Sequence, residues 1–204
     1  MFQSIQFKDC TRRDVAGPTT EAVVAAVLGE YCKPGAPPMR ARSLFDGAAR
    51  VLGEDGFRQV WAEFLKQAVG RKANPLDFAD FLARHEHGRA LPPLADLARF
   101  DLAYALATQP SPAPSVAACC LTEATIRLHR GLMLRFQPNW RYVELAWPVH
   151  RLPPETLTAD LLKTFSPVEP VYLRIAPTGQ GVGITELSAA DFALQRALRD
   201  GRRL

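Results

Sequence analysis

Apolar residues recur at helical spacing over the first half of the chain. We expect helices over about residues 18–31, 41–52 and 54–69, because apolar positions three and four residues apart line one face of each segment. Asn74-Pro75 begins a further helix, and Pro92-Pro93 begins one of about 15 residues whose apolar positions nearly circle its axis. Since such a helix is typical of a buried position, we expect it at the centre of a helical bundle.

Three residues in this half carry local signals. Gly53 is suited to end the helix over 41–52, since glycine is favoured just beyond a helix C-terminus. Asp96 and Arg99 lie three residues apart on the central helix. Because this spacing places both side chains on one side of a helix, we expect them to pair on its surface.

The pattern changes to alternation after a proline-rich connector at residues 109–115. Alternating apolar positions predict strands over 126–136 and 140–147. The segments 171–176 and 182–187 flank a glycine-containing turn, which is the strongest hairpin signal in the chain. Ser188, three residues before Asp191, resembles a helix capping box and begins a closing helix.

These patterns predict an α+β protein. We expect an N-terminal helical bundle, followed by a small antiparallel sheet with a closing C-terminal helix. The predicted division is a helical domain over 1–108, the connector over 109–115 and a small α+β domain over 116–204.

Composition narrows the class of protein. The chain has 204 residues, of which 48% are hydrophobic and 23% charged, and this excludes a mainly disordered protein. No run of about 18 apolar residues occurs, so we expect no membrane partner. The first 14 residues lack a charged segment followed by an apolar stretch. We therefore expect no secretory signal and a cytoplasmic location.

The net charge of +4 is concentrated in one segment. Residues 126–151 contain five arginines and one glutamate, an excess equal to that of the whole chain. The same segment contains Phe136, Trp140, Tyr142 and Trp147. Basic residues among aromatic ones can bind single-stranded nucleic acid, bind an acidic protein or peptide, or simply form a solvated sheet face. All three interpretations stay open at this point.

Catalytic and metal-binding motifs are absent from the sequence. The four cysteines do not have the spacing of zinc ligands, and the glycine-rich segment over 179–183 reads as a hairpin turn rather than a phosphate loop. We expect no metal site in this chain. A metalloenzyme that uses His85, His87, His129 or Cys119 remains as a third hypothesis.

Four segments, in order, resemble the HvfC-like family. They are residues 42–65, residues 77–105 with the Leu-Pro-x-Leu-Ala-Asp-Leu-Ala-Arg stretch at 91–99, the arginine- and leucine-rich segment 126–136, and Trp147-Pro-Val-His-Arg-Leu152. The resemblance covers about residues 40 to 200. The C-terminal half is most similar to the MbnC members of this family, which act in methanobactin biosynthesis.

This resemblance implies a partner subunit without catalytic residues of its own. Family members accompany an iron-dependent TIM-barrel oxidase of the MbnB type, and the complex modifies cysteines of a ribosomally made precursor peptide. In the MbnC case a cysteine becomes an oxazolone with an adjacent thioamide, which later binds copper. We therefore expect no cofactor in this chain and iron in the partner subunit. The alternative is a nucleic-acid-binding regulatory protein that uses residues 126–151.

The sheet supplies the expected binding residues. An extended leader peptide can add a strand at a free edge of the 171–187 hairpin, where the main chain supplies affinity. Basic residues nearby would attract an acidic leader. The residues expected on or beside the leader-binding sheet are Val171, Tyr172, Arg174 and Ile184. Those expected to contact the partner or the peptide are Arg135, Arg141, Trp147 and His150.

Overall fold

The computed structural model describes residues 38–67, 73–109 and 140–199. Its first part contains α2 (Pro38–Leu44), α3 (Asp46–Gln67), the 3-10 turn η1 (Pro75–Asp77), α4 (Phe78–Arg84), α5 (Glu86–Ala90) and α6 (Pro93–Thr108). Its second part contains β1 (Arg141–Leu145), the 3-10 turns η2 (Val149–Arg151) and η3 (Pro154–Thr156), α8 (Ala159–Lys163), β2 (Val171–Thr178), β3 (Gly181–Leu187) and α9 (Ala189–Arg199).

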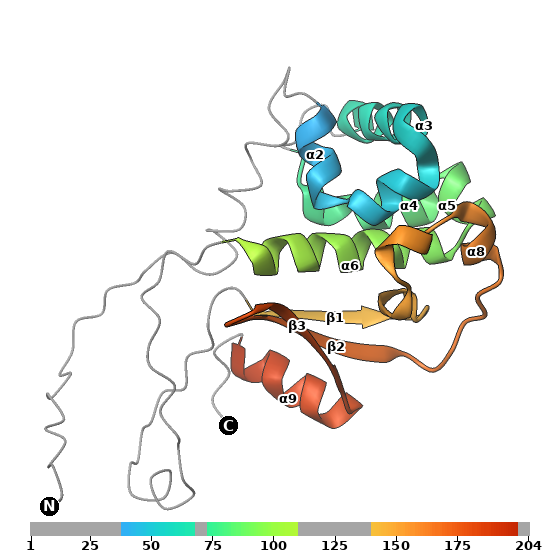
Figure 1. Ribbon diagram of the computed structural model, residues 1–204. Helices are drawn as coiled ribbons and strands as arrows, with labels where there is room; N and C mark the ends of the chain where they lie inside the picture. Colours follow the sequence, from blue (N-terminus) through green and yellow to red (C-terminus); the bar gives the residue numbers. More distant parts are fainter. Residues whose placement is uncertain (1–37, 68–72, 110–139, 200–204) are drawn as a thin grey trace, which may run out of the picture.

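The elements form successive layers (Figure 1). Helices α2 to α5 lie on one side of α6, and the three-stranded sheet lies on the other side. Helix α9 covers the face of the sheet that points away from α6. This arrangement confirms the predicted α+β class, with helices first, then an antiparallel sheet and a closing helix.

Helix α6 lies at the centre, as its apolar pattern predicts. Its residues Leu94, Leu97 and Ala98 are at most 1% exposed, because the helix contacts both the other helices and the sheet. The predicted bundle core is therefore built around this helix.

Among the described helices, none combines the length and the apolar character that crossing a membrane requires.

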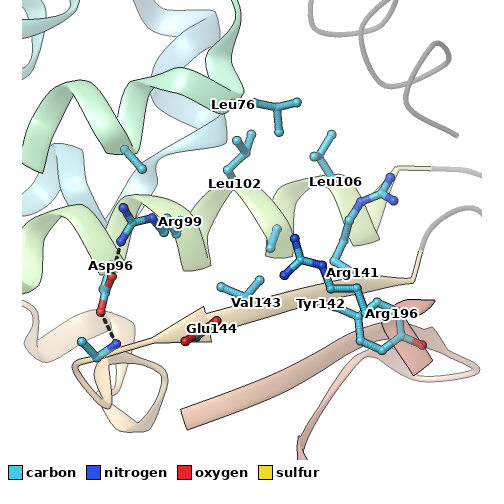
Figure 2. Close-up of a pocket in the computed structure, with 13 residues that line it drawn as sticks. Leu76, Asp96, Arg99, Leu102, Leu106, Arg141, Tyr142, Val143, Glu144 and Arg196 are labelled. Atoms are coloured by element: carbon cyan, nitrogen blue, oxygen red, sulfur yellow. Dashed lines mark hydrogen bonds and ion pairs between the residues drawn. The ribbon is translucent and has the colours of Figure 1, made fainter. Parts of the chain in front are cut away.

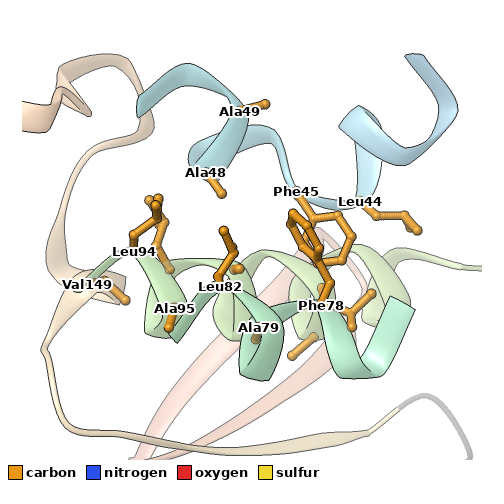
Figure 3. Packing of buried hydrophobic residues seen from close by; sticks show 14 of the residues in the cluster. Leu44, Phe45, Ala48, Ala49, Phe78, Ala79, Leu82, Leu94, Ala95 and Val149 are labelled. Carbon is orange, nitrogen blue, oxygen red and sulfur yellow. The ribbon is translucent and has the colours of Figure 1, made fainter. Parts of the chain in front are cut away.

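One buried cluster joins the helices and the sheet. On the helical side, the Phe78 ring packs 4.7 Å from Phe45 and 4.9 Å from Trp61, measured between ring centroids. Figure 3 shows Leu82, Leu94 and Val149 in the same packed region. The cluster continues through buried residues of the sheet: Val143, Leu145, Leu173 and Ile175. The two halves of the chain thus share a hydrophobic core, while most of the predicted connector lies outside the described residues.

The predicted helix ends are partly confirmed. Gly53 interrupts α3 with a φ of 74°, a left-handed conformation that glycine adopts without strain. The expected helix over 41–52 is also broken at Phe45, between α2 and α3. Asn74 begins the next element, as its side chain accepts a hydrogen bond from the Leu76 N–H at 3.1 Å. The expected helix over 18–31 lies outside the described residues.

The sheet is antiparallel with the order β1-β2-β3. The predicted hairpin is confirmed, but both strands run further than expected and leave only Gly179 and Gln180 in the turn. β1 lies within the predicted strand over 140–147, whereas the predicted strand over 126–136 lies outside the described residues. The expected cap of α9 is present, since the Asp191 N–H donates to Ser188 Oγ at 3.1 Å.

Candidate functional site

β3 is an edge strand whose backbone groups face outward at every second residue. Pro177 pairs with Val182 and has no N–H, so this pair cannot exchange two hydrogen bonds. Because bonded and non-bonded pairs alternate along an antiparallel ladder, the pairs that contain Ile184 and Glu186 are of the same kind. The N–H and C=O groups of Val182, Ile184 and Glu186 therefore point away from β2. We call these groups the β3 edge; within the described part of the chain no hydrogen bond uses them.

A cavity of about 610 Å³ opens beside this edge, between α2, α6, η2 and β3. Its volume falls within the range of about 300–1,000 Å³ that is usual for ligand pockets. Ile184 of β3 and Tyr104 of α6 belong to its lining, and each exposes 40% of its surface. Further apolar side chains of the wall are Leu44, Leu97, Phe100, Val149, Leu152 and Leu157. We call this space the β3 cavity.

His150 brings a polar group into the wall of the β3 cavity. Its Nε2 lies 2.8 Å from Oε1 of Glu186, and Arg151 Nη2 donates to the same oxygen at 2.9 Å. The hydrogen bond from His150, followed by that from Arg151, holds the pKa of Glu186 below its usual value. Because an ionised carboxylate only accepts hydrogen bonds, Nε2 of His150 is the donor in its contact with Glu186.

The Nδ1 atom of His150 is buried and has no hydrogen-bond partner within the described residues. The side chain as a whole is only 6% exposed. A buried polar atom without a hydrogen-bond partner destabilises the folded state.

Asp101 of α6 is another polar residue in the wall of the β3 cavity. Its Oδ2 accepts a hydrogen bond of 2.8 Å from the N–H of Ala48, in the first turn of α3. Gly47 permits this approach, because a Cβ there would lie 2.9 Å from Asp101 Oδ1. Burial raises the pKa of Asp101 to about 7 and outweighs the bond from Ala48, which lowers the pKa.

The raised pKa of Asp101 predicts a pH-dependent stability. In the unfolded chain an aspartate has a pKa of about 3.9, whereas in the folded protein the pKa of Asp101 is about 7. The folded state therefore binds the proton more tightly, and this group's contribution to the free energy of unfolding falls by about 2.5 kcal/mol between pH 5 and pH 8. We expect Asp101→Asn to remove this part of the pH dependence in urea titrations. Parallel pH profiles of the two proteins would contradict the assignment.

Asp96 holds the segment that carries the cavity residues after β1. One carboxylate oxygen accepts from Arg99 at 2.6 Å, and the other accepts from the N–H groups of Ala146 and Trp147 at 2.7 and 3.0 Å. Arg99 also donates to Asp80 of α4 at 2.7 Å. The predicted pairing of Asp96 with Arg99 is confirmed, but its predicted place on the surface is wrong. Asp96 is only 4% exposed, because β1 and the following turn cover it.

A second pocket lies on the other flank of α6 (Figure 2). It has a volume of about 600 Å³ and lies between α6, β1 and α9. Arg99, Arg141 and Arg196 are among its lining residues, so we call it the arginine groove. Figure 2 shows Arg141 and Arg196 beside Tyr142, while Glu144 lies further along β1. Arg141, one of the residues expected to contact a partner, therefore lines a basic groove that is separate from the β3 cavity.

Three of the four residues expected to bind the leader lie on the central strand. β2 pairs with β1 on one side and with β3 on the other, so Tyr172 and Arg174 have no free edge for an added strand. Val171, at the start of β2, pairs with Leu145 of β1. Tyr172 packs on Phe192 of α9 at 4.8 Å between ring centroids, and Arg174 lies 5.0 Å above the Trp140 ring. Of the four, only Ile184 lies on an edge strand of the described sheet.

The remaining expected contact residues differ in position. Trp147 is partly buried against the core, and His150 lines the β3 cavity. Arg135 lies outside the described residues, as does most of the basic segment over 126–151. The nucleic-acid hypothesis therefore stays a prediction.

Two histidines of the metalloenzyme hypothesis, His85 and His87, do not line the β3 cavity or the arginine groove. His85 Nε2 lies 3.0 Å from Glu63 Oε2, and the N–H of His87 donates to His85 Nδ1 at 3.3 Å. Among the described residues, no three side chains of His, Cys, Asp or Glu come together as a metal site would require. His129 and Cys119 lie outside them.

No family model, curated protein or solved structure matches this chain. The resemblance to the HvfC-like family therefore stays a prediction from the sequence. The candidate site rests on the geometry of the β3 edge and the β3 cavity.

Two residues of this site are not recognised from the sequence as functional. Asp101 is visible as a carboxylate on an otherwise apolar helix, and that is a usable signal for a buried acid. Glu186 gives no such signal, because its partner His150 lies 36 residues earlier in the chain.

Proposed function

We propose that this chain is a peptide-binding partner subunit. It binds the leader of a ribosomally made precursor peptide at the β3 edge and presents the peptide's cysteines to an iron-dependent TIM-barrel oxidase, which holds the iron. The observation that carries the peptide-binding part is the β3 edge, where the backbone of every second residue (Val182, Ile184 and Glu186) faces outward beside a cavity. The part played by the oxidase rests on the resemblance to the HvfC-like family.

The β3 edge has the chemistry that strand addition needs. Val182, Ile184 and Glu186 each offer one N–H and one C=O to an incoming strand, and such main-chain bonds supply affinity without regard to sequence. Side chains of the added strand alternate between the two faces of the sheet. Those on the face of Ile184 meet the β3 cavity, which can therefore supply specificity.

The charge beside the β3 edge is compatible with an acidic leader. Glu186 is bonded to both His150 and Arg151, so its negative charge is compensated on the protein itself. The Arg151 side chain remains 58% exposed. Such an exposed arginine would speed the encounter with an acidic peptide more than it would strengthen the final complex.

Co-purification tests this function. The full chain is tagged and expressed together with its neighbouring genes. It is expected to elute with an iron-containing TIM-barrel protein and a short cysteine-bearing peptide. Iron is measured in the eluted complex by atomic emission, and the peptide is identified by mass spectrometry. Elution of the folded chain alone, with both other proteins present and folded in the lysate, would overturn the proposal.

A further inference from the structure

We propose that the arginine groove binds an acidic segment of the precursor peptide, in which a glutamate or aspartate stands beside an apolar residue. This segment is separate from the strand that pairs with β3. The inference rests on the proposed function and extends it, because it names a second contact with the peptide and the class of residue that this contact takes.

One end of the groove carries positive charge from two elements. Arg141 of β1 and Arg196 of α9 both line it there (Figure 2). Within the described part of the chain, Arg196 has no hydrogen bond or ion pair to another side chain. The carboxylates of the lining do not bond to it, since Asp96 is bonded to Arg99 and Glu144 lies further along β1. A carboxylate on a ligand can therefore accept charge-assisted hydrogen bonds from this guanidinium.

The rest of the groove is largely apolar. Apolar side chains of η1, α4, α6 and β1 belong to its lining: Leu76, Ala79, Leu102, Ala103, Leu106 and Val143. Leu76 exposes 46% of its surface, and covering it with an apolar side chain of a ligand is favourable. A bare anion covers no such surface. The lining therefore favours an acidic residue that has an apolar neighbour.

The position of Arg196 is fixed by contacts between α9 and the sheet. The Tyr142 hydroxyl donates to Gln195 Oε1 at 3.2 Å, which joins β1 to the helix that carries Arg196. The Tyr142 ring also packs edge-on against Phe192 of α9, at 6.1 Å between ring centroids. The guanidinium is thus placed before a ligand arrives, and this lowers the entropy cost of binding.

The size and lining of the groove favour a peptide over nucleic acid. Single-stranded nucleic acid is bound along basic grooves that follow several nucleotides and stack their bases on successive aromatic rings. The volume here is about 600 Å³, which suits a few side chains, and Tyr142 is the one aromatic residue among the described lining. A short acidic and apolar segment of a peptide matches both features.

Three short peptides test the groove without the precursor. Acetyl-Leu-Glu-Leu-amide carries the acidic and apolar groups. Acetyl-Leu-Gln-Leu-amide replaces the carboxylate by an amide of similar shape, and acetyl-Ser-Glu-Ser-amide replaces the apolar side chains. In amide NMR titrations of the full chain, the first peptide is expected to shift the signals of Leu106, Val143 and Arg196. It should bind about tenfold more tightly than the second, as a hydrogen bond between charged groups commonly provides, and at least threefold more tightly than the third.

Three variants establish where and how the peptides bind. Arg196→Gln removes the unpaired guanidinium, so the preference for glutamate over glutamine is expected to fall below threefold. Arg58→Gln is the matched control, because it removes the same charge from an exposed site on α3 outside the lining, and it should keep the tenfold preference. Leu76→Ser should weaken both leucine-containing peptides by about threefold and leave their ratio unchanged.

Four outcomes would each overturn the inference. They are equal binding of the glutamate and glutamine peptides, a tenfold preference that persists in Arg196→Gln, signal shifts confined to residues outside the arginine groove, and a thymidine octanucleotide that binds at the same residues more tightly than the glutamate peptide. None of these results bears on strand addition, which depends on the backbone of the β3 edge. Conversely, a chain that binds the glutamate peptide as expected but recovers no precursor peptide would contradict the proposed function and leave the chemistry of the groove in place.

Discussion

Replacing Asp96 by alanine is expected to lower the free energy of unfolding by about 3–5 kcal/mol. The carboxylate is buried and bonded to Arg99 and to two backbone N–H groups, so its removal leaves a guanidinium and two buried donors short of an acceptor. Urea unfolding of the variant and the wild type, followed by circular dichroism, measures the difference.

Asp80→Ala is the matched control for that variant. Asp80 also accepts from Arg99, but its side chain is 67% exposed. An exposed ion pair contributes little, so its loss should cost less than about 1 kcal/mol. Equal losses in the two variants, or a loss below about 1 kcal/mol for Asp96→Ala, would contradict the role of Asp96 in joining α6 to the segment after β1.

Ile184→Pro is expected to weaken peptide binding by at least thirtyfold, or about 2 kcal/mol. Proline removes an outward N–H and places its ring where the incoming strand would lie, while the bonds between β2 and β3 remain. The peptide recovered with the chain by co-purification is the ligand, and fluorescence anisotropy of its labelled form gives the dissociation constant. A circular dichroism spectrum equal to that of the wild type shows that the fold is retained.

Two further variants test whether the backbone of β3, rather than the Ile184 side chain, causes the weaker peptide binding. Ile184→Ala keeps the N–H and should weaken the peptide by less than about fivefold. Thr185→Pro removes an N–H that faces β2 and should destabilise the hairpin itself. If Ile184→Pro and Ile184→Ala bind the peptide equally well, the backbone of β3 does not receive an added strand.

The elements with regular patterns could be predicted from the sequence. Apolar residues lie nearly all round the axis of α6 and indicate its central place. Alternating apolar and polar residues on both sides of a glycine-containing turn indicate the β2–β3 hairpin. Gly53 indicates the interruption of α3. These predictions succeed because each depends on residues that are close together in the chain.

The predictions that were wrong depend on contacts between residues far apart in the chain. The three-residue spacing of Asp96 and Arg99 predicts their pairing but not their burial, which comes from Ala146 and Trp147 some 50 residues later. The hairpin pattern likewise does not show that β1 pairs with β2 rather than with β3. For that reason the expected leader-binding residues fell mainly on the central strand. Once the register is known, Pro177 shows which backbone groups of β3 face outward, because it pairs with Val182 and has no N–H.

Amide hydrogen exchange tests the central claim most directly, because it reports each N–H of β3 separately. In the full chain, the amides of Gly183 and Thr185 face β2, whereas those of Val182, Ile184 and Glu186 face outward. Saturation with the co-purifying peptide is expected to slow exchange at Val182, Ile184 and Glu186 by at least tenfold and to leave Gly183 and Thr185 much less affected. Tight binding of the peptide with unchanged exchange at Val182, Ile184 and Glu186 would contradict strand addition at the β3 edge.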